Sequence, residues 1–95
     1  MVRVIASLFI KNEHIDTVKP LFREMLEATQ KEKGCIEYRL FEKEGEPGFY
    51  VFVEEWESSE DLKNHSQSEH YKRIVPQVGS FKSKDGAVWV MKEFK

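Results

Sequence analysis

The hydrophobic periodicity of this chain changes along its length, and the order of those changes limits its fold more than any other feature. Apolar residues recur at every second position over 2–10, which predicts a strand. Over 16–33 they recur at helical spacing, and Gly34 then supplies a left-handed helix end. Because proline weakens a helix interior, we expect Asp16 or Thr17 near the helix cap, with Pro20 close to the first turn.

Two more strands are predicted after this helix. Residues 35–43 alternate between apolar and polar positions, and the glycines and proline of 44–48 indicate a turn. Residues 49–57 are dense in aromatic and β-branched side chains, which favour strands. The three segments together predict a β-hairpin.

A second helical region is expected between this hairpin and the end of the chain. Ser58 and Ser59 can cap a helix that begins around Glu60. Ser66 and Ser68 can cap a second helical piece, which Pro76 bends or ends, so the region is expected to be broken rather than straight. Residues 87–94 then close the chain as the last strand.

This order predicts an α+β fold, the ferredoxin-like β-α-β-β-α-β arrangement, in which two helices cover one face of a four-stranded antiparallel sheet. The length of 95 residues suits a single domain over 1–95. Both residue sets of the first and last strands are rich in apolar side chains. The uncovered face of the sheet would therefore expose a patch too large for a monomer, and we expect a homodimer.

The composition argues against several classes of partner and cofactor. The 15 basic and 17 acidic residues leave no broad positive field that would attract nucleic acid or anionic membrane lipid. No apolar stretch approaches the roughly 20 residues of a membrane span, and no export signal is visible, so a cytoplasmic location is expected. No glycine-rich phosphate loop and no closely spaced set of Cys and His occur, so we expect no nucleotide, flavin or metal cofactor.

Two motifs resemble those of the antibiotic biosynthesis monooxygenase family. The run Glu54-Glu55-Trp56-Glu57-Ser58-Ser59-Glu60-Asp61-Leu62, with His65 downstream, is similar to the family's strand that ends in Glu-x-Trp and leads into a helix carrying a His. Gly34-Cys35-Ile36-Glu37-Tyr38 is similar to its Gly-Cys-x-x-Tyr entry to the second strand. The resemblance covers nearly the whole chain.

This resemblance implies a dimeric α+β barrel of ferredoxin-like subunits, each with a pocket between its sheet and its helices. Known activities of the family include oxygenation of quinols and polyketide phenols without metal or flavin, haem degradation, and isomerisation of a quorum signal. The family's haem-degrading residues are replaced here by Ser7, His65, and Ile74 or Val75, whereas the stretch 65–72 resembles the quinol-oxidising and isomerase branches. We therefore expect a cofactor-independent monooxygenase acting on a small aromatic or quinol-like substrate with O2. The alternatives are an isomerase of a small quorum-signal-like metabolite and a non-catalytic dimeric binding module.

Acid-base side chains among aromatic ones carry the expected chemistry. His65 is the first candidate for a general base because an ordinary histidine pKa of about 6.5 lets it gain and lose a proton near neutral pH. His70 follows five positions later and shares a pocket with His65 only if the helix breaks between them. Tyr71 is the third catalytic candidate, and His14 is expected at the surface. The candidates for substrate binding are the aromatic and acidic residues Trp56, Glu54, Tyr38, Phe52 and Phe9.

Each candidate also has a purely structural interpretation. His65 can be a solvent-facing helix residue, and Glu54 can be a buried anchor that needs a hydrogen-bond partner. The aromatic residues are more often core or dimer contacts than ligand contacts.

RNA-recognition domains share the same element order and place aromatic residues on strands one and three to stack on bases. Residues 8–12 and 48–53 superficially match these two motifs. However, Glu46-Pro47 stands where a basic residue is usual, and the glutamates at the end of the third strand would repel phosphates. The sequence therefore disfavours RNA binding.

Overall fold

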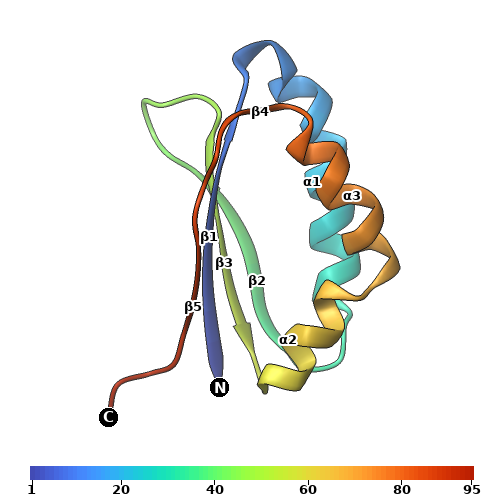
Figure 1. Ribbon diagram of the computed structural model, residues 1–95, viewed down its shortest axis with the longest axis vertical. Helices are drawn as coiled ribbons and strands as arrows, with labels where there is room; N and C mark the ends of the chain where they lie inside the picture. Colours follow the sequence, from blue (N-terminus) through green and yellow to red (C-terminus); the bar gives the residue numbers. More distant parts are fainter.

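The computed structural model describes residues 1–95 and has two layers, a sheet and a set of helices on one of its faces (Figure 1). The elements in chain order are β1 (Val2–Ile10), the 3-10 helix η1 (Asn12–His14), α1 (Ile15–Gln30), β2 (Cys35–Glu42), β3 (Phe49–Trp56), α2 (Ser59–Ser66), α3 (Glu69–Gly79), β4 (Lys82–Lys84) and β5 (Val88–Met91). The predicted α+β class and ferredoxin-like arrangement are confirmed. None of the helices is sufficiently long and apolar to cross a membrane.

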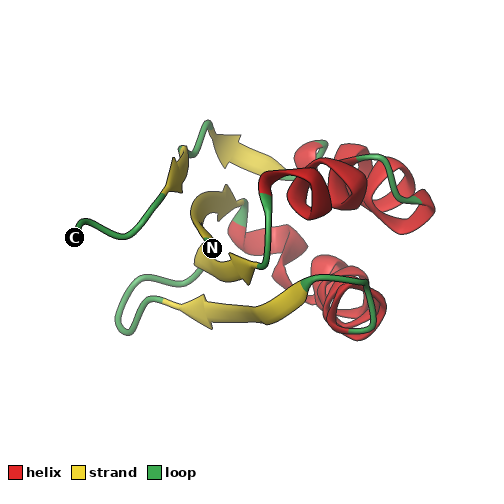
Figure 2. Cartoon of the chain, turned by 90° about the horizontal axis from the view of Figure 1, so that it is seen from below, coloured by secondary structure: helices red, strands yellow, loops and turns green.

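The sheet is antiparallel, with the order β2-β3-β1 and with β4 and β5 both paired to the free edge of β1. The expected strand over 87–94 is shorter, Val88–Met91 (β5), and an additional short strand, β4, precedes it over Lys82–Lys84. The two strands are separated by 85–87, and within this segment a Cβ atom on Gly86 would overlap the backbone carbonyl of Ser7. Ala87 follows, and its N–H donates to Ser7 Oγ over 2.9 Å in place of a regular ladder bond. Figure 2 shows the two short strands at the edge of the layer opposite the helices.

Helix α1 begins one residue earlier than predicted, and the expected cap at Asp16 or Thr17 is wrong. The 3-10 turn leads directly into the helix, since the His14 N–H already donates to the Lys11 carbonyl over 2.9 Å. His14 occupies the cap position without a side-chain hydrogen bond, and Pro20 lies inside the helix. The expected apolar stripe does face the sheet, and its buried members are Val18, Phe22, Met25 and Thr29.

The second helical region is broken, as predicted, because two serines cap two separate helices. Ser58 Oγ accepts from the Asp61 N–H over 3.1 Å at the start of α2. Ser68 Oγ accepts from the Tyr71 N–H over 3.3 Å at the start of α3. Pro76 does not end α3, which continues to Gly79.

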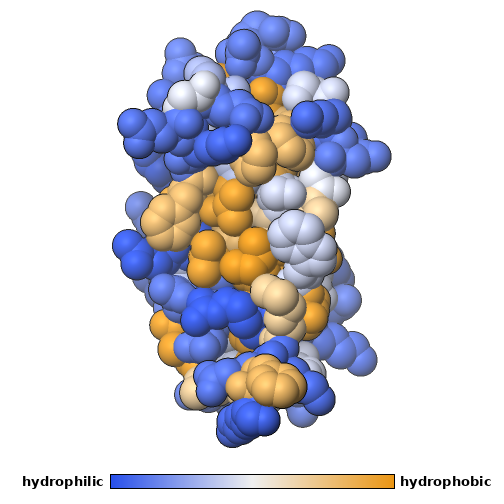
Figure 3. Space-filling model, turned by 90° about the vertical axis from the view of Figure 1, so that its left-hand side faces the viewer, coloured by the Kyte–Doolittle hydropathy of each residue, from blue (hydrophilic) through white to orange (hydrophobic).

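The core fills the space between the sheet and the helices in two clusters, Val4, Met25, Tyr38, Trp56 and Ile74 in one and Ile10, Val18, Phe22 and Tyr50 in the other. Side chains alternate between the two faces of a strand, so the intervening residues point away from the helices. On that outer face Ile5 lies between Val53 and Trp89 in the strand pairing. Trp89 is 55% exposed there, and Figure 3 shows hydrophobic side chains gathered along the middle of this face.

We expect this outer face to be covered by a second copy of the chain, because an apolar patch of this kind is unfavourable in water. Light scattering at micromolar concentration should then give about twice the 11.2 kDa mass of one chain. Trp89→Asp places a charge in the patch and should shift the mass toward the monomer. Arg23→Glu, on the exposed side of α1, is the matched control and should leave the dimer intact. A wild-type mass near that of one chain would contradict the expectation.

Candidate active site

A cavity of about 470 Å³ lies between the sheet and the helices. Most of the residues around it are hydrophobic, 14 of 20, which suits a small apolar ligand held by a few polar groups. The titratable side chains in its wall are those of Tyr38, Glu54, Lys63, His65 and Tyr71. Val88 and Val90 of β5 line it on one side while remaining 67% and 61% exposed. The cavity therefore opens to solvent beside β5.

His65 occupies the wall of this cavity and is only 3% exposed. It belongs to the last turn of α2, which turns its ring in toward the sheet. Its ring lies 4.8 Å from that of Trp56, 5.1 Å from that of Tyr71 and 5.5 Å from that of Tyr38, measured between centroids. Packing among three aromatic rings fixes the orientation of the imidazole.

Glu32 fixes which nitrogen of His65 carries the proton. Its Oε2 lies 2.7 Å from His65 Nδ1. A carboxylate only accepts hydrogen bonds, so Nδ1 is the donor and Nε2 is left with a lone pair. Every fully buried side-chain nitrogen and oxygen has a hydrogen-bond partner. His65 Nε2 has no partner within the chain, so this atom is not fully buried, and the side chain that carries it lines the cavity.

The turn that carries Glu32 is shaped by Gly34, which adopts a φ of 82°. A side chain at this position would be strained by the left-handed backbone and would overlap Asp61 at the start of α2. The turn after α1 can therefore pack directly against α2. This close approach allows Glu32 to reach His65, 33 residues away in the sequence.

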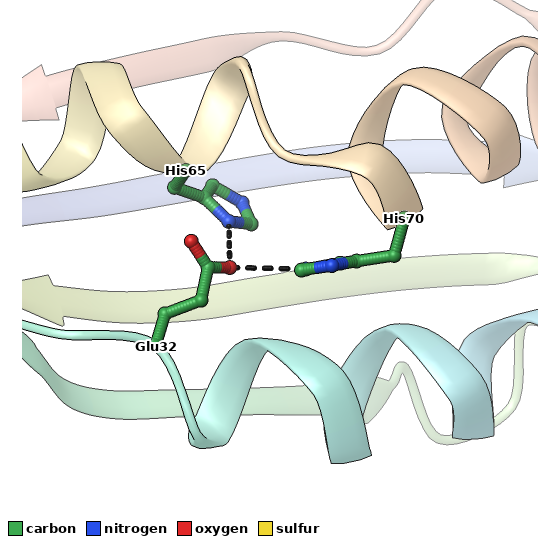
Figure 4. Close-up of side chains that lie close together, drawn as sticks. All are labelled: Glu32, His65 and His70. Atoms are coloured by element: carbon green, nitrogen blue, oxygen red, sulfur yellow. Dashed lines mark hydrogen bonds and ion pairs between the residues drawn. The ribbon is translucent and has the colours of Figure 1, made fainter.

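His70 meets the same carboxylate from the start of α3 (Figure 4). Its Nε2 lies 3.0 Å from Glu32 Oε2 and 3.2 Å from Thr29 Oγ1. The sequence indicated that the two histidines come together only across a break in the helix. The break between α2 and α3 is present, and the ring centroids of His65 and His70 are 6.1 Å apart.

Burial shifts the pKa values of three groups around the cavity. It lowers the pKa of His65 below the ordinary value, although the hydrogen bond with Glu32 opposes the change. Burial raises the pKa of Glu54, opposed by the Trp56 indole N–H, which donates to Glu54 Oε1 over 3.0 Å. Burial also raises the pKa of Tyr38. Near neutral pH the His65 ring is therefore uncharged and able to accept a proton, while Tyr38 retains its own.

The structure separates the residues predicted for the site into two groups. The cavity wall contains Glu54, Tyr38, Phe52, His65 and Tyr71. The others lie elsewhere. Trp56 is fully buried in the core. His70 is hydrogen-bonded to Glu32 and does not line the cavity. Phe9 packs on Phe49, with 4.4 Å between the ring centroids. His14 is outside the cavity and packs against Phe81.

Glu32 is the member of the site that the sequence did not indicate. It lies among the lysines at the end of α1, in a pattern typical of a solvated helix end. Its proximity to Gly34 was the only available signal, and a glycine there predicts a turn rather than a partner for a histidine.

Comparison with known proteins agrees with this geometry. The sequence model of the antibiotic biosynthesis monooxygenase family matches residues 1–77. The chain belongs to the antibiotic biosynthesis monooxygenase family. A solved structure described as an antibiotic biosynthesis monooxygenase is similar over 100% of both chains, with 42% identity and a TM-score of 0.97.

Two curated relatives from this comparison carry a named activity. The protein named "Putative monooxygenase Rv0793" of Mycobacterium tuberculosis is 31% identical over 95% of this chain and 88% of its own. Its structure superposes with a TM-score of 0.91. The protein named "Putative monooxygenase YcnE" of Bacillus subtilis is 27% identical over 79% of each chain. The family and the general type of reaction named for its members therefore agree with the expectation from the sequence.

Glu54→Gln should make the protein more stable at pH 7. Folding raises the pKa of Glu54 above its value in the unfolded chain. The protonated form of Glu54 therefore favours folding, and this contribution to stability is complete at a pH below the unfolded pKa. It is lost as the pH rises through the folded pKa. The amide keeps an acceptor for Trp56 but carries no charge to bury. Urea unfolding should show a stability gain over wild type at pH 7 that disappears below about pH 4. The exposed Glu57, replaced by Gln as a control, should show no such difference, and equal stability of Glu54→Gln and wild type at both pH values would contradict the assignment.

Proposed function

We propose that this protein is a cofactor-independent monooxygenase that oxidises a small aromatic or quinol-like substrate with O2. The observation that carries the proposal is the Glu32–His65 pair, in which one ring nitrogen is bound and the other has no partner within the chain, in the wall of a mostly apolar cavity. Membership in the antibiotic biosynthesis monooxygenase family supports the type of reaction. The character of the cavity supports the class of substrate.

The first step is proton transfer from the substrate to His65. A quinol or enol bound in the cavity presents its hydroxyl group to His65 Nε2, which accepts the proton. The resulting imidazolium is stabilised by the Glu32 carboxylate at Nδ1, as in other pairs of a carboxylate and a histidine base. This proton transfer comes first because only the deprotonated substrate is electron-rich enough to react directly with O2.

The reaction balances without an external reductant. The substrate anion transfers electrons to O2, and a C–O bond forms at the activated carbon. Loss of water then breaks the O–O bond and leaves a carbonyl group at this carbon, which carries one hydrogen in the quinol or enol form, while the substrate hydroxyl group supplies the second hydrogen of the water. One oxygen atom enters the product and the other leaves as water, so the four electrons that O2 accepts all come from the substrate.

The cavity wall suits this chemistry because it combines a mostly apolar lining with hydrogen-bond donors that can stabilise the anion. Tyr38 and Tyr71 bring hydroxyl groups from opposite layers, β2 and α3, to the same cavity. Phe52 of β3 provides an aromatic surface. We propose that Glu54, Tyr38 and Phe52 contact the substrate and that Tyr71 donates a hydrogen bond to its developing oxyanion.

His65→Ala is expected to lower turnover by roughly 100-fold or more, the usual contribution of a general base. The measurement is O2 consumption with menadiol-like quinols, corrected for autoxidation. His14→Ala is the control, since His14 is outside the cavity, and it should leave the rate unchanged. Equal rates for the two variants, or a substrate rearranged without any use of O2, would contradict the proposed function.

Glu32→Gln tests the second member of the pair through the pH dependence of turnover. Glu32 raises the pKa of His65 against the effect of burial, so removing its charge should lower that pKa further. Activity that needs neutral His65 rises with pH, and this rise should move to lower pH in the variant. The maximal rate should fall by about 10- to 100-fold because the ring is less well oriented. A pH profile unchanged from wild type would show that Glu32 has no such role.

Turnover is expected to survive exhaustive treatment with a chelator, and the active protein should show no flavin absorbance. The physical reason is that the substrate itself supplies all the electrons that O2 accepts. The check is the rate before and after chelation, with metal content measured in parallel. Loss of turnover that is restored by adding a metal would contradict the proposed chemistry.

A further inference from the structure

The side chains of Glu32, His65 and His70 present three metal-binding atoms to one point between the helices. Glu32 Oε2, one nitrogen of His65 and one of His70 all lie within 4.8 Å of one another. They come from three different segments, the turn after α1, the end of α2 and the start of α3 (Figure 4). The sequence showed no metal motif because this set is assembled only by folding.

The chemistry of the three groups selects a class of metal. Two imidazoles and one carboxylate favour divalent first-row transition ions such as Zn²⁺, Co²⁺ and Ni²⁺ over Mg²⁺ or Ca²⁺, which prefer oxygen ligands. Three protein ligands also leave a fourth position for water, as in many open zinc sites. The hydroxyls of Thr29 and Ser68 lie 3.2 and 3.4 Å from His70 Nε2. They border the same point with further oxygen atoms.

The present distances define how far the three side chains must move to bind an ion. Glu32 Oε2 is 2.7 Å from His65 Nδ1 and 3.0 Å from His70 Nε2, which are hydrogen-bond lengths. Ligands about 2.0 Å from a tetrahedral ion lie about 3.3 Å apart. A shift of about half an ångström in the Glu32 side chain, which lies in a turn, lengthens its two contacts to this value. The two histidine nitrogens lie within 4.8 Å of one another, so the imidazoles have to approach by up to about 1.5 Å. The side chains of Glu32 and His70 are 17% and 13% exposed, so an ion can enter without crossing the substrate cavity.

We propose that Glu32, His65 and His70 bind a divalent transition metal ion and that the bound ion switches off His65 as a base. An ion at Nδ1 replaces the proton that Glu32 holds there, so a neutral ring must carry its proton on Nε2. Nε2 then faces the cavity without a lone pair and cannot accept a proton from the substrate. The inhibitory half of this inference rests on the proposed function, whereas the binding half does not.

Binding is tested first with the metal ion alone, independently of turnover. Titration calorimetry of the chelator-treated full chain with Zn²⁺ should give one ion per chain, and Co²⁺ should develop visible ligand-field bands. His70→Gln and Glu32→Gln each remove one ligand and should weaken binding at least about tenfold. His14→Ala is the matched control and should bind like wild type. No binding, or equal binding by wild type and both ligand variants, would overturn the site.

Inhibition is tested second, with each protein compared with its own metal-free rate. Zn²⁺ should suppress quinol turnover by wild type and by His14→Ala over the concentration range in which it binds, and a chelator should restore the rate. His70→Gln should need at least about tenfold more Zn²⁺ for the same loss. Full turnover by Zn²⁺-saturated wild type would overturn the switch. Metal binding by a protein that oxidises no quinol would count against the proposed function while leaving the metal site intact.

Discussion

The hydrogen bond between Glu32 and His65 is the interaction on which the candidate site depends. It joins the turn after α1 to the end of α2 across 33 residues of sequence. It also determines which ring nitrogen can act as a base, because Nδ1 donates its proton to Glu32 and Nε2 keeps its lone pair. Without it, nothing in the chain would select which nitrogen of the buried His65 ring carries the proton.

Several local features of the fold serve this one contact. Gly34 allows the turn to pack against α2, and Ser68 starts a new helix that brings His70 to the same carboxylate. The rings of Trp56 and Tyr71 hold the imidazole from two sides. The buried polar groups thus have hydrogen-bond partners within the chain, whereas His65 Nε2, in the cavity wall, has none. This arrangement is expected of a binding site rather than of a packed core.

Most of the fold could be predicted from the sequence because it follows from local periodicity. The strand over Val2–Ile10 and the break before α3 depend on residues close together in the chain. The additional strand β4 and the gap over 85–87 that separates it from β5 could not be predicted, since this gap lies against Ser7, about eighty residues away in the sequence. In the site, His65 was indicated by its chemistry and motif. Glu32 was not, because nothing near it in the sequence shows that a histidine of α2 folds onto it.

Nitrogen NMR of isotope-labelled histidine at neutral pH tests the central claim most directly, because it reports the protonation of each ring nitrogen separately. In the metal-free protein we expect His65 to be neutral, with the proton on Nδ1 in a strong hydrogen bond and with Nε2 unprotonated. Glu32→Gln should weaken the signature of that hydrogen bond, whereas His14→Ala should leave it unchanged. A His65 ring with its proton on Nε2, or one that remains positively charged at neutral pH, would contradict the account.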